Sequence, residues 1–215
     1  MGAFYTLIIV AEERQERIAE ALREMNRTAF VSQPMNGLTA VFDKECESQD
    51  VPLLESVTRD LCRRLQCGAM AAANHDDDIL LLLLCTRAEE MARYIWVSPF
   101  YPDEFRVGGD TKEDFSRTFG EVFRGVAAAT QCLDTLTRIE EMKVEETMRA
   151  VDDDGFTPVS ASSILCFVVS ELRLESLVGY GYGYNYLLTS RTGHADNMQH
   201  IRPSRRPFSG WQGDG

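Results

Sequence analysis

A run of five consecutive polar residues could do chemistry, namely Asn74, His75, Asp76, Asp77 and Asp78. Carboxylate oxygens and imidazole nitrogens are ligands that Mg²⁺, Mn²⁺ and Zn²⁺ take in proteins. In extended backbone, successive side chains point to opposite faces, so His75 would pair with Asp77, and Asp76 with Asp78. Only two of these ligands would then lie on each side, and a complete site needs help from elsewhere in the chain.

Two interpretations of this segment stay open. In the first, His75, Asp76 and Asp78 hold a divalent metal ion together with Asp110 or Glu104, in a metal-dependent hydrolase or phosphoryl-transfer enzyme. In the second, the segment is a solvated hairpin turn whose Asp and Asn side chains bond to nearby backbone groups. We favour the turn, which needs no cofactor.

Two aromatic patterns are candidates for binding surfaces. Tyr94 and Trp96 are two positions apart, so they share a face of an extended segment and would mark a partner or ligand site if exposed. Packing in the core is the alternative. In the segment 179–186, glycine or asparagine alternates with tyrosine, which favours an edge strand with an aromatic face over a surface that stacks ligand rings.

Familiar catalytic motifs are absent from the sequence. It contains no Walker loop, no Gly-x-Ser-x-Gly elbow and no His-Glu-x-x-His helix. Its six cysteines include no Cys-x-x-Cys pair, and several lie in apolar runs, so we expect buried, reduced thiols. The sequence therefore offers no complete catalytic constellation.

Charge and hydropathy narrow the classes of partner. The net charge is −12, which repels a phosphate backbone, so we expect no nucleic-acid partner. The long apolar run Ile79–Cys85 is far shorter than the ~20 residues of a membrane helix, and the N-terminal apolar run is too short for a signal peptide. We therefore expect a cytoplasmic protein without a membrane partner.

The elements around the polar run follow from hydrophobic periodicity. Residues 4–10 predict a buried strand, Ile18 and Leu22 lie on one face of a helix, and Asn36-Gly37 predicts a tight hairpin turn between two short strands. Pro52 fits the first turn of a second helix, which Ser48 or Asp50 could cap. A strand over 69–73 and a hairpin over 79–97 complete the pattern.

This order predicts an α+β fold: a ferredoxin-like split βαβ core extended by an antiparallel hairpin, with a helical C-terminal region. We expect the core over residues 1–98. Residues 99–190 would supply a connector, helices and a possible final strand over 179–188. The polar, Pro-, Gly- and Arg-rich segment 191–215 predicts a disordered tail.

Four segments resemble an uncharacterised family of bacterial cytoplasmic α+β proteins: the opening 1–6, the helix entry 47–50, the 74–78 run and Gly108-Gly109-Asp110. The resemblance covers about residues 1–120, with a weaker echo over 179–188. It implies the fold and a bacterial cytoplasmic setting. The family has no known activity to transfer, so the resemblance gives no residue a role.

The sequence thus favours a non-catalytic interaction or regulatory module with another protein as its partner. Its candidate binding residues are Asn74, His75, Asp76, Asp77, Asp78, Asp110, Tyr94 and Trp96. The metal-dependent enzyme is the alternative.

Overall fold

A computed structural model describes residues 4–98, 108–149, 160–174 and 198–203. The chain is α+β, as predicted, with a seven-stranded sheet in the order β6-β5-β4-β1-β3-β2-β7. Every neighbouring pair of strands is antiparallel. The strands are β1 Phe4–Val10, β2 Ala29–Val31, β3 Thr39–Asp43, β4 Ala69–His75, β5 Ile79–Cys85, β6 Met91–Val97 and β7 Gln199–Ile201.

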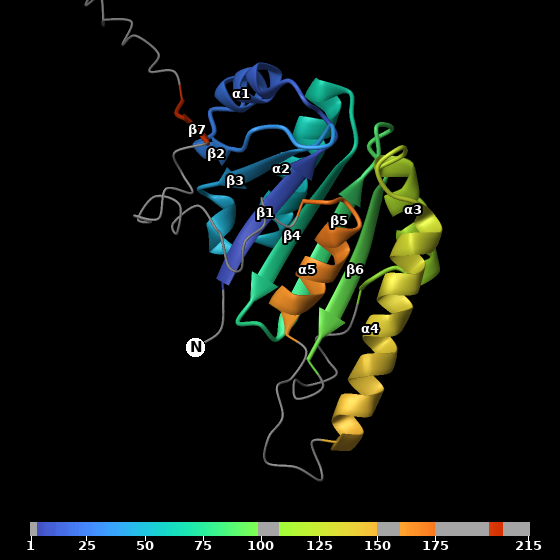
Figure 1. Cartoon of the computed structure of the whole chain (residues 1–215). Coiled ribbons are helices and arrows are strands. Elements are labelled where there is room, and N and C mark those ends of the chain that lie inside the picture. The colour runs from blue at the N-terminus through green and yellow to red at the C-terminus, as the bar shows by residue number, and fades with distance from the viewer. Residues whose placement is uncertain (1–3, 99–107, 150–159, 175–197, 204–215) are drawn as a thin grey trace, which may run out of the picture.

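Helices cover both faces of the sheet (Figure 1). The helices are α1 Gln15–Glu24, α2 Val51–Leu65, α3 Lys112–Val122, α4 Ala129–Arg149 and α5 Ala161–Ser170, and a 3-10 turn, η1, spans Cys46–Ser48. Side chains of α1 and α2 share one hydrophobic cluster with the sheet. Those of α3, α4 and α5 share the other. Strands covered on both faces have little need for polar positions, which explains the continuous apolar run of β5.

Local sequence signals account for several element boundaries. Asn36 and Gly37 have φ angles of 53° and 78°, the positive values that a type I′ hairpin turn requires. The Asp50 side chain caps α2 by accepting from the Leu53 N–H, and a proline lies in its first turn. These turn and cap predictions are confirmed.

The sheet is larger than the predicted core plus one hairpin. β5 and β6 extend it beyond β4, as expected, but β7 also extends it beyond β2. β7 lies within the range that we predicted to be a disordered tail, so that prediction is wrong for Gln199–Ile201. Three residues pair it with β2, and contacts of this kind over a long sequence separation leave no periodic signal. The possible strand over 179–188 lies outside the described residues.

At the other edge, the segment 108–111 protects β6. The Asp110 N–H donates to the Arg93 carbonyl oxygen at 2.8 Å, and the Arg93 N–H donates to Asp110 Oδ2 at 2.7 Å. An open strand edge is a template for aggregation, and this cover removes part of it.

None of the helices within the described ranges is both long enough and apolar enough to cross a membrane.

Candidate functional site

The Asn74–Asp78 run forms the tight turn between β4 and β5. Asp76 and Asp77 have φ angles of 55° and 62°, and the Asp78 N–H donates to the His75 carbonyl oxygen at 3.0 Å. Two successive positive φ angles are typical of a type I′ hairpin turn, a conformation that Asp tolerates better than most residues. The run is therefore a hairpin turn, as in the interpretation that we favoured.

A polar cluster ties this turn to the start of α5. Asn74 Nδ2 donates to Asp77 Oδ1 at 2.9 Å and to Ser162 Oγ at 2.8 Å, and the Ser162 hydroxyl also donates to Asp77 Oδ1. The Ala161 N–H donates to the Asp77 carbonyl oxygen at 2.8 Å. A carboxylate at a helix N-terminus is favoured by the helix dipole. Asp77 thus serves to dock α5 on the turn.

Tyr5 closes the cluster on the β1 side, where its hydroxyl donates to Ser162 Oγ at 3.4 Å. Burial raises the pKa of Tyr5 above its ordinary value, so the phenol stays protonated and able to donate at neutral pH. Neither Asn74 nor Tyr5 is accessible to solvent to any extent, at 0% and 2% exposed. Asp77 and Ser162 are half-buried, so the cluster is a partly buried contact between elements.

His75 lies on the other side of the turn. Its ring meets the Phe4 ring edge to face, with the centroids 4.9 Å apart, and its Nδ1 is 2.7 Å from Gln49 Oε1. Gln49 Nε2 also donates to the Asn74 carbonyl oxygen. The prediction that His75 shares a face with Asp77 is wrong, because the left-handed turn residues interrupt the alternation of extended backbone.

The remaining proposed metal ligand, Asp110, lies beside Arg93 near the middle of β6. Val97 pairs with Ile79 next to the turn. Arg93, which Asp110 contacts, is four residues from Val97 along β6, so Asp110 lies roughly 13 Å from the turn. Among the described residues, no three His, Cys, Asp or Glu side chains lie close enough together to hold a metal ion. Glu104 lies outside these residues. The metal hypothesis stays a prediction without an assembled ligand set.

Tyr94 and Trp96 belong to the core. They are 6% and 3% exposed, in the cluster that β6 forms with α3, α4 and α5. The Tyr94 ring lies 5.7 Å from that of Phe115, and burial raises the pKa of Tyr94 well above its ordinary value. The alternatives for Tyr94 and Trp96 were an exposed binding surface and packing in the core. Because α3 packs over them, packing in the core is favoured.

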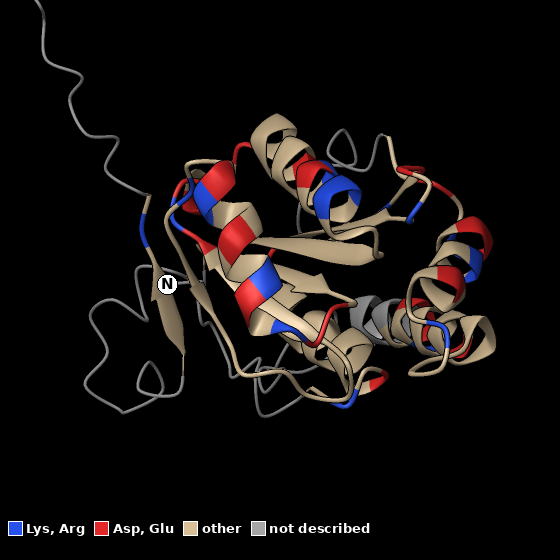
Figure 2. Ribbon diagram, turned by 90° about the horizontal axis from the view of Figure 1, so that it is seen from above, with Lys and Arg blue, Asp and Glu red and all other residues tan. Residues whose placement is uncertain are grey.

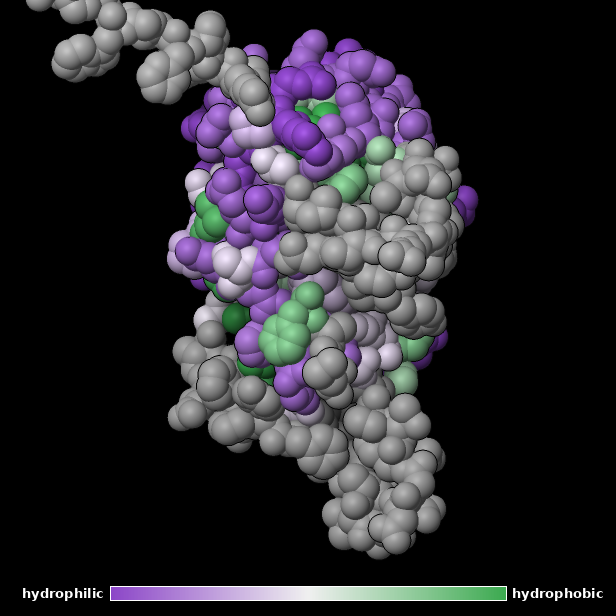
Figure 3. Space-filling model, turned by 90° about the vertical axis from the view of Figure 1, so that its left-hand side faces the viewer, coloured by the Kyte–Doolittle hydropathy of each residue, from purple (hydrophilic) through white to green (hydrophobic). Residues whose placement is uncertain are grey.

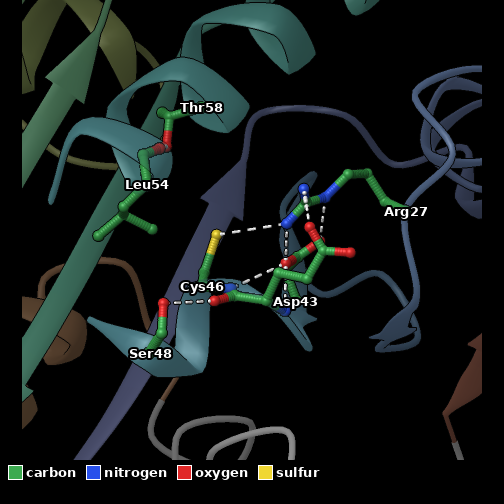
Figure 4. A network of polar contacts seen from close by, with 7 residues as sticks. Arg27, Asp43, Cys46, Ser48, Leu54 and Thr58 are labelled. Atoms are coloured by element: carbon green, nitrogen blue, oxygen red, sulfur yellow. Dashed lines mark hydrogen bonds and ion pairs between the residues drawn. The ribbon is translucent and has the colours of Figure 1, made fainter. Parts of the chain in front are cut away.

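A buried ion pair that the sequence did not indicate joins the ends of β2 and β3 (Figure 4). Arg27 Nε donates to Asp43 Oδ2 at 2.8 Å, and Arg27 Nη2 donates to Asp43 Oδ1. Arg27 Nη1 reaches Glu45 at 2.7 Å. Asp43 Oδ1 also accepts the N–H groups of Glu45 and Cys46 at 2.9 and 3.0 Å.

This ion pair is structural. The Asp43 side chain is 0% exposed and that of Arg27 is 9% exposed, so no ligand can reach the carboxylate without local opening. Burial raises the pKa of Cys46 beside it, which keeps the thiol protonated and unreactive. Arg27 and Asp43 are 16 residues apart in the sequence. Two charged residues at that separation form no recognisable motif, so their contact could not be predicted.

Two adjoining pockets lie at the opposite end of the sheet from the Asn74–Asp78 turn. Figure 2 shows the backbone seen from above Figure 1, with positive and negative residues interspersed along its helices. The volumes of the two pockets are about 520 and 390 Å³. They share Ala11 after β1, Gln66 and Cys67 after α2, and Arg87 after β5. Because β4 runs its full length between the turn and the pockets, the two regions are roughly 20 Å apart.

Four arginines and three glutamates line these pockets: Arg14, Arg17, Arg87, Arg124, Glu12, Glu13 and Glu121. We call this region the arginine-lined surface. It carries an excess of positive side chains, although the chain as a whole has a net charge of −12. Sequence reasoning missed it, because the arginines come from three separate segments, the start of α1 and the ends of β5 and α3, that only the fold brings together.

Two of the arginines are already satisfied by Glu12. This carboxylate accepts from Arg14 Nε at 2.9 Å, from the Arg14 N–H at 3.0 Å and from Arg17 Nη1. Burial alone would raise the pKa of Glu12, but hydrogen bonds from Arg14 and the charge of Arg17 lower it below its ordinary value. The surface thus already holds one carboxylate of its own.

The other two arginines have no such partner. The guanidinium groups of Arg87 and Arg124 are exposed, and neither makes a hydrogen bond or an ion pair with any described residue. Cys67 lines both pockets, and burial raises its pKa to about 12. The thiol is therefore protonated at neutral pH, so this surface is equipped to bind an anion and offers no thiolate nucleophile.

No protein-family model, curated protein or solved structure gives a significant match to the chain. These comparisons therefore add no activity to the resemblance between segments of this chain, such as the opening residues and the 74–78 turn, and a bacterial family.

Proposed function

We propose that this protein is a non-catalytic binding module that recognises a carboxylate-bearing segment of a partner protein at the arginine-lined surface. The observation that carries the proposal is the pair of exposed arginines that line one pocket together, Arg87 and Arg124, of which Arg87 also lines the adjoining pocket. A free guanidinium offers a planar fork of donors that matches a carboxylate. Two such groups, neither of which has a partner among the described residues, are available for an external ligand.

The internal carboxylate supports the choice of ligand. Glu12 shows which donors this surface offers a carboxylate: two guanidinium groups and one backbone N–H at the start of α1. The positive end of the α1 dipole favours an anion at the same place. Both pockets are open to solvent along the end of the sheet, which suits a peptide segment lying across them.

The absence of catalysis is also a proposal. Residues that could serve as acids, bases or ligands are used in internal contacts: Asp77 with Ser162, Asp110 with Arg93, and His75 with Gln49. Groups with such internal contacts hold elements of the fold together, and a protein that only binds a partner needs no catalytic role for them. No specific contact favours the metal-dependent alternative.

Two finer proposals accompany this one. We infer that β1, β2, β3 and β4, with α1 and α2, form a ferredoxin-like core, because their order in the sheet is β4-β1-β3-β2 with both helices on one face. We also infer a cytoplasmic setting. All six cysteines are free thiols, as expected of a chain kept in a reducing compartment.

The test measures binding of a fluorescent peptide of alternating Glu and Ser by anisotropy. A charge-assisted hydrogen bond contributes about 1.5–3 kcal/mol, so the double variant Arg87→Glu/Arg124→Glu should bind the peptide at least tenfold more weakly than the wild type. Rising salt should weaken the wild-type complex.

Arg23→Glu is the matched control. Arg23 is also exposed, and its guanidinium makes no contact with a described residue, but it lies outside both pockets. Equal binding by the wild type and the double variant would refute the proposal. So would equal losses in the double variant and the control. Saturable binding of inorganic phosphate without any binding of the peptide would also refute it, and would point to a small-anion site.

A further inference from the structure

The strand β7 completes one edge of the sheet by pairing with β2. Ala29 lies opposite Ile201, Phe30 opposite His200 and Val31 opposite Gln199, in antiparallel register. These three residues of β2 are 0–6% exposed in the folded chain. Without β7, β2 would present an open backbone edge and buried apolar side chains to solvent.

The contacts of β7 define what this edge accepts. On one face, the His200 ring stacks on Phe30 with the centroids 4.4 Å apart and 16° between the planes. On the other face, Ile201 is 1% exposed and joins the cluster that includes Ile18 and Leu22 of α1. The β2 edge therefore accepts an extended segment in which one residue places an aromatic ring on one face of the sheet and the following residue places an aliphatic side chain on the other face.

Within the described part of the sheet, β7 is joined by its pairing with β2 alone. It pairs over three residues, whereas β1 and β4 pair over seven, and only Ile201 of its three side chains is fully buried. Short pairings with little buried area open far more often than the global unfolding of the chain. The described surface on this side of the molecule is mainly hydrophilic (Figure 3).

We infer that the β2 edge is an acceptor site for an extended strand, and that the Gln199–Ile201 segment of a second copy of this chain can occupy it in place of the chain's own β7. The contacts would be the same in both cases, since β2 and α1 belong to the accepting chain whichever copy supplies β7. Residues 175–197 separate β7 from the last described residue of the α5 region, a length that spans at most roughly 75 Å when extended. That reach suffices for a neighbouring molecule.

Strand exchange of this kind is a low-cost route to a dimer, because it creates few new contacts and removes few. The net charge of −12 on each chain opposes the encounter. Salt screens that repulsion over distances beyond about 10 Å at 0.1 M. Dimerisation through this edge should therefore increase both with protein concentration and with salt.

The test uses the full chain and the variant Ile201→Asp, in which the buried aliphatic group of β7 becomes a charge. The probe is a labelled peptide with the sequence of residues 196–203. The variant should bind the peptide at least tenfold more tightly than the wild type, since its own strand no longer competes. A peptide with serine in place of isoleucine is the control and should not bind.

Light scattering after size exclusion completes the test. The wild type should form a dimer between 10 µM and 1 mM protein that increases with salt, and the variant should stay monomeric. If Ile201→Asp loses its native circular dichroism, His200→Glu replaces it, because this change removes the stacking on Phe30 and leaves the buried Ile201 in place. Equal peptide binding by the wild type and a folded variant would overturn the inference. A wild type that stays monomeric throughout would exclude the second copy as occupant.

Discussion

Removal of the Asp43 carboxylate should destabilise this protein strongly. In Asp43→Ala, Arg27 loses both hydrogen bonds of a buried ion pair, and two backbone N–H groups, those of Glu45 and Cys46, lose their acceptor. Breaking a buried pair from one side costs about 3–5 kcal/mol, and Glu45, which is 58% exposed, is the one ion-pair partner among the described residues that Arg27 keeps. For a chain of this size each kcal/mol lowers Tm by about 2–4 °C, so we expect a loss of roughly 6–20 °C.

The matched control is Glu45→Ala. Glu45 binds the same guanidinium at 2.7 Å, but its side chain is 58% exposed while that of Asp43 is 0% exposed. An exposed pair contributes about 0–1 kcal/mol, so this variant should lie within about 3 °C of the wild type. Both values come from thermal and urea unfolding followed by circular dichroism.

The comparison of Asp43→Ala with Glu45→Ala tests whether the burial of the carboxylate, and not its charge alone, causes the loss of stability. If the two variants lose the same stability, the reasoning fails, because the arginine is common to both. An Asp43→Ala variant as stable as the wild type would refute it as well. Asp43→Asn adds a finer measurement, since it removes the charge but keeps one side-chain oxygen, and it should fall between the two.

Two further predictions concern helix packing and pH. A Cβ atom on Gly120 would lie 2.5 Å from the Ala129 backbone nitrogen, so Gly120→Ala should force α3 away from α4 and cost about 1–3 kcal/mol in urea unfolding, whereas the exposed Glu113→Ala should change little. Folding raises the pKa of Cys67 and of Cys132 to about 12 from an ordinary value of 9.0, with burial the largest cause for each. Their contribution is therefore complete below pH 9 and lost as the pH rises toward 12, by up to about 1.4 kcal/mol per pH unit for each thiol. The slope should become shallower in Cys67→Ser, and a free energy of unfolding that is flat from pH 9 to 11 would contradict this account.

Much of the fold could be predicted from the sequence, because local patterns depend on neighbouring residues. The periodicity of apolar side chains gave the strands Phe4–Val10, Ile79–Cys85 and Met91–Val97 with the observed bounds. Asn36-Gly37 predicted a hairpin turn, because these two residue types readily adopt the positive φ angles that such a turn requires, and the structure has those angles. β7 was missed, because three residues in a polar segment become a strand only where an edge is available.

The candidate site shows the same division. The sequence identified the polar turn at 74–78 and its residue types, but not that Asp77 meets Ser162, which is 85 residues away. It also could not indicate that Arg87 and Arg124, from the ends of β5 and α3, line one pocket. Local structure follows from backbone preferences and hydrophobic periodicity, which the sequence determined by itself. Which polar groups become buried partners, and which stay exposed to bind a ligand, was decided only when the helices packed on the sheet, because burial and distance are properties of the whole fold.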